Sequence, residues 1–147
     1  GSSDNAVVQF QTMVKKAVAD YRHTLPRDAQ HPFIAAFPKR FRATAWGVIL
    51  DNGAYQVPHI HPSAWLSGVY YVQLPKVVSV DDPEHPGWIE FGRPYWDFHI
   101  DKEPETRLVK PEEGMLILFP AYVFHRTVPF VGDEHRISIA FDILHDE

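Results

Sequence analysis

Two histidines separated by one residue form the most suggestive chemical pattern in this chain. They lie in the stretch Pro58-His59-Ile60-His61-Pro62. On a β-strand, residues i and i+2 point to the same face, so both imidazole rings can reach one metal ion. Imidazole is a good ligand for several divalent transition metals. The pair therefore predicts part of a metal site, although a chain with nine histidines could also place two such residues on its surface by chance.

A third histidine, His125, stands after an apolar run that extends from Gly114 to Phe119 and turns at Pro120. We expect the run to be a strand and His125 to lie at the start of the next strand. In a barrel of antiparallel strands, this return delivers a third imidazole to the site that the first pair opens. Considered alone, His125 is better explained as a structural histidine near a turn.

The last apolar stretch places an arginine and a serine on one face of a predicted strand. Arg136 and Ser138 alternate with Ile137 and Ile139, and Ala140 and Asp142 continue the polar face. If the aliphatic face packs outward, Arg136 and Ser138 point into the barrel. A guanidinium there needs an anionic partner, for which a carboxylate is the natural choice. The alternative is an internal salt bridge, for instance with Glu90 or Asp142.

Composition limits the classes to which the protein can belong. With 147 residues, the chain has room for one ordinary core. Its net charge is −5 and no run of Lys or Arg exceeds two, which argues against a nucleic-acid backbone or an anionic membrane as partner. The absence of cysteine excludes disulfides, thiolate nucleophiles and Cys-type zinc sites. Without a transmembrane stretch or signal-peptide pattern, a cytoplasmic location is the default expectation.

The chain divides into an N-terminal segment and a β-rich remainder. Residues 1–40 are expected to hold one helix, over residues 4–24 with Asp4 as N-cap, followed by a connecting segment. Residues 41–147 are expected to form the β-rich domain that carries the candidate metal ligands. Gly1-Ser2 is typical of the scar left by a cleaved affinity tag, so the chain is compatible with a fragment of a longer protein. The sequence does not indicate an oligomeric state.

From Phe41 onward, short runs rich in β-branched and aromatic residues alternate with Pro, Gly and Asp, which predicts a mainly β sandwich or barrel. The expected strands are Arg42–Leu50, Ala54–His59, Ser67–Leu74, Trp88–Phe91, Gly114–Phe119, Phe124–Phe130 and His135–Leu144. The connection from Gly92 to Glu112 is long and aromatic. It is expected to be a lid over the barrel mouth or a segment packed on the wall.

Taken together, these motifs resemble a known family. The His59-Ile-His61-Pro pair, Leu66-Ser-Gly-Val-Tyr-Tyr-Val, the distal His125 and Arg136-Ile-Ser138 look like the bacterial 2-oxoglutarate/Fe(II)-dependent oxygenases found alone or after tetratricopeptide repeats. These are relatives of the prolyl hydroxylases. The resemblance covers about residues 44–142.

This resemblance implies a double-stranded β-helix, a jelly-roll barrel like that of the cupins, with the N-terminal helix packed on its outside. It implies Fe(II) on His59, His61 and His125, with Zn or Ni as substitutes. It also implies 2-oxoglutarate as co-substrate, held by Arg136, Ser138 and Tyr71. The primary substrate is not identified by the sequence, and a protein or peptide side chain is one candidate.

One position departs from the family pattern, in which two histidines and one carboxylate bind the metal. Here His61 stands where Asp or Glu is expected. The site could use three imidazoles, His61 could turn away, or a carboxylate such as Glu90 could complete the site. The departure also favours an alternative, a cupin-type metal enzyme or a metal- or ligand-binding module that does not use 2-oxoglutarate.

Overall fold

A computed structural model describes every residue of the chain except 1, 80 and 147. The chain divides into two compact units, Gly1–Phe37 and Pro38–Glu147. Among the described residues, no helix has the length and apolar character needed to cross a bilayer.

The first unit consists of helix α1 (Ser2–Thr24) and the short helix α2 (Pro32–Ala35). The predicted helix is therefore confirmed, but it begins before Asp4, which lies in the first turn rather than at the N-cap. A carboxylate there still interacts favourably with the helix dipole. The guanidinium of Arg22, in the last turn of α1, lies 4.4 Å from the ring centroid of Phe37, which links the end of the helix to the end of the unit.

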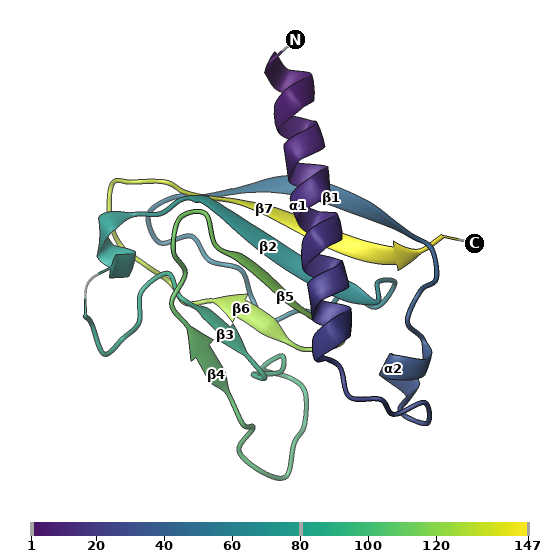
Figure 1. Ribbon diagram of the computed structural model, residues 1–147. Coiled ribbons are helices and arrows are strands. Elements are labelled where there is room, and N and C mark those ends of the chain that lie inside the picture. Colours follow the sequence, from purple (N-terminus) through teal and green to yellow (C-terminus); the bar gives the residue numbers. More distant parts are fainter. Residues whose placement is uncertain (1, 80, 147) are drawn as a thin grey trace. The chain divides into compact units, whose positions relative to one another are not determined.

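The second unit is a double-stranded β-helix built from two antiparallel sheets (Figure 1). The four-stranded sheet has the order β1-β7-β2-β5, and the three-stranded sheet has the order β4-β3-β6. A short 3-10 helix, η1 (Lys76–Ser79), follows β2. The strands are β1 (Phe41–Leu50), β2 (Leu66–Gln73), β3 (Ile89–Phe91), β4 (Arg107–Val109), β5 (Leu116–Pro120), β6 (His125–Thr127) and β7 (Arg136–His145).

Strand β7 is the central element of the larger sheet, because it pairs with β1 on one side and β2 on the other. Its alternation is the one expected from the sequence: Arg136, Ser138 and Asp142 are all buried. The register sets Ser138 opposite Tyr71 and Asp142 opposite Ser67. Side chains on one face of neighbouring strands are close enough to interact at such positions.

The core of this unit forms between the two sheets. Val69, Tyr71 and Ile89 are buried together, and partly buried apolar side chains from β3, β4 and β5 pack around them. On β2, a Cβ at Gly68 would lie 2.2 Å from a ring carbon of Phe141. Only glycine lets this aromatic ring approach the backbone so closely.

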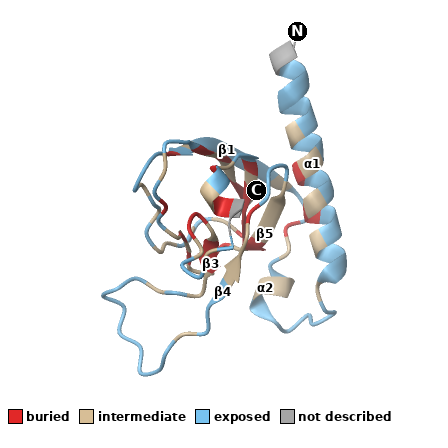
Figure 2. Cartoon of the chain, turned by 90° about the vertical axis from the view of Figure 1, so that its left-hand side faces the viewer, coloured by how far each residue is buried: buried red, intermediate tan, exposed pale blue. Residues whose placement is uncertain are grey.

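Two expectations about the strands were wrong. Residues 54–58 form no strand, and His59 makes only an isolated bridge to His125, because Pro58 and Pro62 cannot donate to a ladder. The predicted connection Gly92–Glu112 contains strand β4. Its first part, between β3 and β4, is exposed along most of its length (Figure 2).

Candidate metal centre and anion pocket

A cavity of about 220 Å³ lies between the two sheets. Residues of β1, β2, β3, β5, β6 and β7 line it, so both sheets contribute walls. The walls carry all of the residues that the sequence singled out: His59, His61, Tyr71, His125, Arg136 and Ser138. The fold thus brings together positions that are up to 79 residues apart in the chain, from His59 to Ser138.

Three histidines lie close together in the wall of this cavity. One ligand atom from each of His59, His61 and His125 lies within 4.8 Å of the others. Backbone hydrogen bonds hold the cluster: His59 and His125 each donate an N–H to the other's carbonyl, over 3.1 and 3.2 Å. The N–H of His61 donates to the carbonyl of Ala121, in the turn between β5 and β6, over 2.9 Å.

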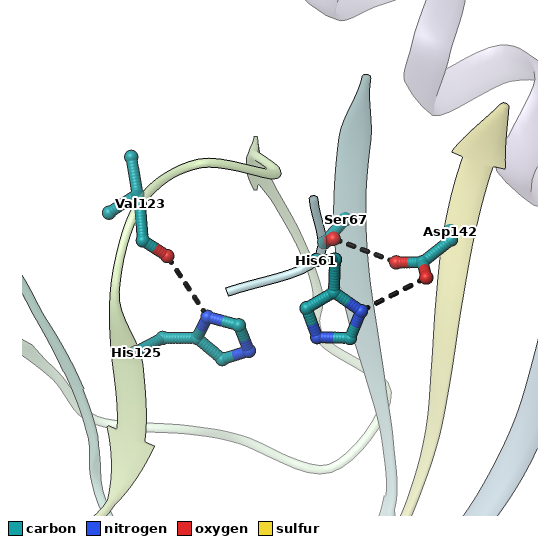
Figure 3. Close-up of polar contacts among 5 residues, drawn as sticks. All are labelled: His61, Ser67, Val123, His125 and Asp142. Atoms are coloured by element: carbon teal, nitrogen blue, oxygen red, sulfur yellow. Dashed lines mark hydrogen bonds and ion pairs between the residues drawn. The ribbon is translucent and has the colours of Figure 1, made fainter. Parts of the chain in front are cut away.

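Each of the three rings has an acceptor at its Nδ1 atom. The Nδ1 of His59 lies 2.7 Å from the carbonyl oxygen of Val57, and that of His125 lies 3.1 Å from that of Val123. The Nδ1 of His61 lies 3.0 Å from a carboxylate oxygen of Asp142 (Figure 3). Because an oxygen acceptor requires Nδ1–H as donor, each neutral ring keeps its Nε2 lone pair for a metal.

Burial keeps two of these rings neutral. It lowers the pKa of His125 to about 4, and the neighbouring His59 acts in the same direction. Burial also lowers the pKa of His59. A metal ligand must be deprotonated at Nε2, so this donor set is ready to bind a metal near neutral pH.

Arg136, Tyr71 and Ser138 form a second cluster, which we call the anion pocket. All three side chains are buried, with Tyr71 fully inaccessible. The guanidinium carbon of Arg136 lies 5.1 Å from the centroid of the Tyr71 ring. Among the described residues, the hydroxyl of Tyr71 and the Nε of Arg136 are buried without a hydrogen-bond partner of normal geometry, although the two side chains lie close enough for each to shift the other's pKa. Buried polar atoms are rarely left unpaired, so these two donors fit an absent acceptor.

The charge of this pocket specifies the acceptor. Burial raises the pKa of Tyr71 to about 12, although Arg136 opposes the shift, so the phenol remains a donor at neutral pH. Among the described residues, no carboxylate forms an ion pair with Arg136. A buried guanidinium without a counter-ion is costly. An anionic ligand, such as a carboxylate, would satisfy both residues at once.

The carboxylates that the sequence offered as alternatives have other partners. Glu90 binds Arg93 over 2.5 Å and Arg126 over 2.9 Å. Burial opposes ionisation of Glu90, but the two arginines hold its pKa below the ordinary value. Glu90 therefore neither completes the histidine cluster nor pairs with Arg136. His61 does not turn away, because its ring lies 5.1 Å from that of His59 and 5.2 Å from that of His125, centroid to centroid.

Sequence reasoning missed two residues of the site. Asp142 was considered only as a partner of Arg136, whereas it contacts His61 and accepts a 2.7 Å hydrogen bond from the hydroxyl of Ser67. Trp46 stacks on His61 with the ring centroids 5.8 Å apart. The alternation of β7 placed Asp142 on the correct face, but only the register of β2 shows which side chain it meets.

Comparison with known proteins found a family model and solved structures that resemble this chain. A family model described as "Putative 2OG-Fe(II) oxygenase" matches residues 44–142. A crystal structure of a Pseudomonas putida prolyl-4-hydroxylase superposes with a TM-score of 0.51 at 16% identity, covering 71% of this chain and 53% of that one. A crystal structure of an oxidoreductase of the 2OG-Fe(II) oxygenase family from Burkholderia pseudomallei superposes with a TM-score of 0.55 at 13% sequence identity. The match covers 78% of this chain and 48% of that one. This chain therefore spans about half the length of either structure. Comparison with curated proteins gave no match.

Proposed function

Because this chain belongs to the 2OG-Fe(II) oxygenase family, we propose that it couples the oxidative decarboxylation of 2-oxoglutarate to the hydroxylation of a second substrate. In this reaction one oxygen atom of O₂ enters succinate, which forms with loss of CO₂. The other oxygen atom enters a C–H bond of the substrate as a hydroxyl group. The observation that carries the proposal is the pair of unsatisfied buried donors, Tyr71 and Arg136, in the cavity that the three histidines line.

In this proposal, the anion pocket would bind one end of 2-oxoglutarate, and the three histidines would hold the metal ion. Arg136, with its fork of donors, would bind the distal carboxylate of 2-oxoglutarate, and the Tyr71 hydroxyl would donate to it. Ser138, buried on the same strand face, would add a further hydroxyl. His59, His61 and His125 would hold Fe(II), which when bound supplies the redox chemistry with oxygen.

The protein's own contribution is orientation and exclusion of water. The cavity walls include Val48, Val69, Ile89 and Phe119, so the reacting centre lies against apolar surface. Zn(II) or Ni(II) should occupy the same imidazoles as inactive substitutes, since both metals accept imidazole ligands. A cytoplasmic location remains a prediction from the sequence alone.

For the primary substrate, we propose a protein or peptide side chain. A groove of about 680 Å³ lies beside the cavity and shares Arg126 with its wall. The groove combines charged side chains with exposed aromatic ones, among them Trp96 at 88%, Phe98 at 57% and Tyr55 at 52%. Exposed apolar patches of this kind mark protein interaction sites.

The test combines binding and turnover. Fe(II) and 2-oxoglutarate added without oxygen should give a visible charge-transfer band, and admission of air should give succinate and CO₂. The variant His125→Ala, which removes one imidazole, should lose both signals. A wild-type protein that gives neither band nor succinate would refute the proposal.

A further inference from the structure

We propose that Asp142 is a positioning residue of the metal centre, which acts through His61 and supplies the negative charge that an all-histidine ligand set lacks. This inference rests on the proposed function, because it concerns the same metal ion. It assigns a role to a carboxylate that is not itself within the cluster of ligand atoms.

The three histidines are not equivalent. His59 and His125 each have a backbone carbonyl at Nδ1, from the residue two positions earlier in the chain. Only His61 has a carboxylate there, from a residue 81 positions away. A carboxylate accepts a stronger hydrogen bond than a carbonyl does, and it makes the imidazole a better electron donor at Nε2. His61 is therefore expected to be the strongest electron donor of the three rings.

The fold fixes this carboxylate in place. Asp142 lies on the central strand β7, between Thr44 of β1 and Ser67 of β2. The Ser67 hydroxyl donates to Oδ1 over 2.7 Å, while Oδ2 accepts from His61 over 3.0 Å (Figure 3). With one oxygen held by each partner, Asp142 is oriented toward the Nδ1 edge of His61.

The charge balance explains why such a residue is needed here. Three neutral imidazoles leave the full double charge of a divalent ion, whereas two imidazoles and one carboxylate reduce it by one. The side chains of His61 and Asp142 are only 15% and 12% exposed, so water screens their interaction with the ion weakly. The ligand set has no negative charge because an imidazole, His61, stands where a carboxylate is expected. Asp142 supplies that negative charge from behind the His61 ring.

The test measures the affinity for Co(II), a spectroscopic probe for the Fe(II) site, in variants at this position. Asp142→Asn keeps the shape and an acceptor oxygen but removes the charge. Loss of such an outer partner weakens metal binding about 10- to 100-fold. We expect a decrease in that range, with a shifted Co(II) absorption spectrum. The matched control is Asp51→Asn, which removes a carboxylate bound to His135 outside the cavity and should leave Co(II) affinity unchanged.

Repeating the Asp142→Asn change in a His61→Ala variant distinguishes an effect that acts through His61 from a general loss of stability. In His61→Ala, the further change Asp142→Asn should have no additional effect on Co(II) affinity, because the ring that transmits the charge is gone. An unchanged affinity in the single variant, or an equal decrease in both backgrounds, would overturn the inference. A wild-type protein that does not bind Co(II) would instead refute the metal centre of the proposed function.

If Asp142→Asn does not fold, the wild-type protein still decides the question. In the Zn(II)-loaded protein, the Nδ1–H proton of His61 should resonate downfield of those of His59 and His125 in the NMR spectrum, because only it is bound to a carboxylate. Assignment follows from the signal lost in His61→Ala. Three Nδ1–H protons at similar shifts would overturn the proposal.

Discussion

Replacing Arg136 with methionine should weaken the binding of 2-oxoglutarate without weakening the ligand-free fold. The two side chains are similar in length, so the change removes the charge and the donors but leaves no large cavity. Arg136 is 2% exposed and has no ion pair among the described residues. A residue that serves structure would instead be expected to have its charge satisfied within the protein.

The size of the effect follows from the burial. Truncating one partner of a buried, hydrogen-bonded charge pair costs about 2–5 kcal/mol. At about 1.4 kcal/mol for each factor of ten, the lower limit corresponds to a roughly 30-fold rise in the dissociation constant. Because Tyr71 and Ser138 remain as donors, we expect a value nearer this limit, about 100-fold, or roughly 2.8 kcal/mol.

The free energy of unfolding of the ligand-free Arg136→Met variant should rise, although its affinity for 2-oxoglutarate falls. Burial lowers the pKa of Arg136, which reflects the cost of keeping this guanidinium charged away from water. An apolar replacement of an unpaired buried charge removes that cost. A gain of about 1 kcal/mol would raise the midpoint of thermal unfolding by about 2–4 °C in a domain of this size.

The assay is a 2-oxoglutarate titration of the Co(II)-loaded protein without oxygen, alongside thermal unfolding of the metal-free protein. The variant Arg136→Lys serves as a second probe, since it keeps the charge but loses the two-pronged geometry. An unchanged affinity for 2-oxoglutarate in Arg136→Met would refute the anion pocket and favour a cupin-type enzyme. A midpoint lowered by several degrees would show that Arg136 is structural.

Three further predictions follow from the same cavity. Tyr71→Phe removes a buried hydroxyl that has no hydrogen-bond partner of normal geometry among the described residues. The affinity for 2-oxoglutarate should therefore fall about 5- to 10-fold, as for one hydrogen bond of about 1–1.4 kcal/mol, with no loss of thermal stability. A destabilised variant would contradict this. Co(II) at 100 times its dissociation constant should stabilise the protein by about 2.7 kcal/mol, and EDTA should reverse the rise in unfolding midpoint. In the metal-free protein, the pKa of His125 is about 4 in the folded state against 6.5 in the unfolded state. The contribution of neutral His125 to the free energy of unfolding is therefore fully present above pH 6.5 and is lost as the pH falls toward 4. The loss should approach roughly 3 kcal/mol in urea titrations, and His125→Gln should flatten the profile.

Much of the β architecture could be predicted from local sequence, because the strands of the larger sheet have clear patterns. Strand β7 is the best case, since Arg136, Ser138 and Asp142 alternate with apolar residues over positions 136–143. Strand β4 was missed because it has only three residues and lies within a long connection. The parity argument for His59 and His61 brought the right rings together although the segment is not a strand, since one bridge at His59 orients it.

The partners of the charged residues could not be predicted, because they depend on register between distant strands. Glu90 meets Arg126 because the two residues are paired across β3 and β6. Asp142 meets Ser67 for the same reason, across β7 and β2. Nothing in the local sequence distinguishes these pairings from a salt bridge between Arg136 and either carboxylate, which the sequence allowed and the structure does not contain.

Strand β7 links the two halves of the site, and this constrains how the departure at His61 is understood. Arg136 and Asp142 are six residues apart, so they lie on the same face at about 3.3 Å per residue along the strand. One serves the anion pocket, and the other contacts the metal cluster through His61. A register shift of one residue would turn both away from the cavity. The alternation that buries Arg136 therefore also places a carboxylate behind His61. Under the proposed function, an imidazole could then stand at the usual carboxylate position while Asp142 keeps a negative charge close to the metal centre.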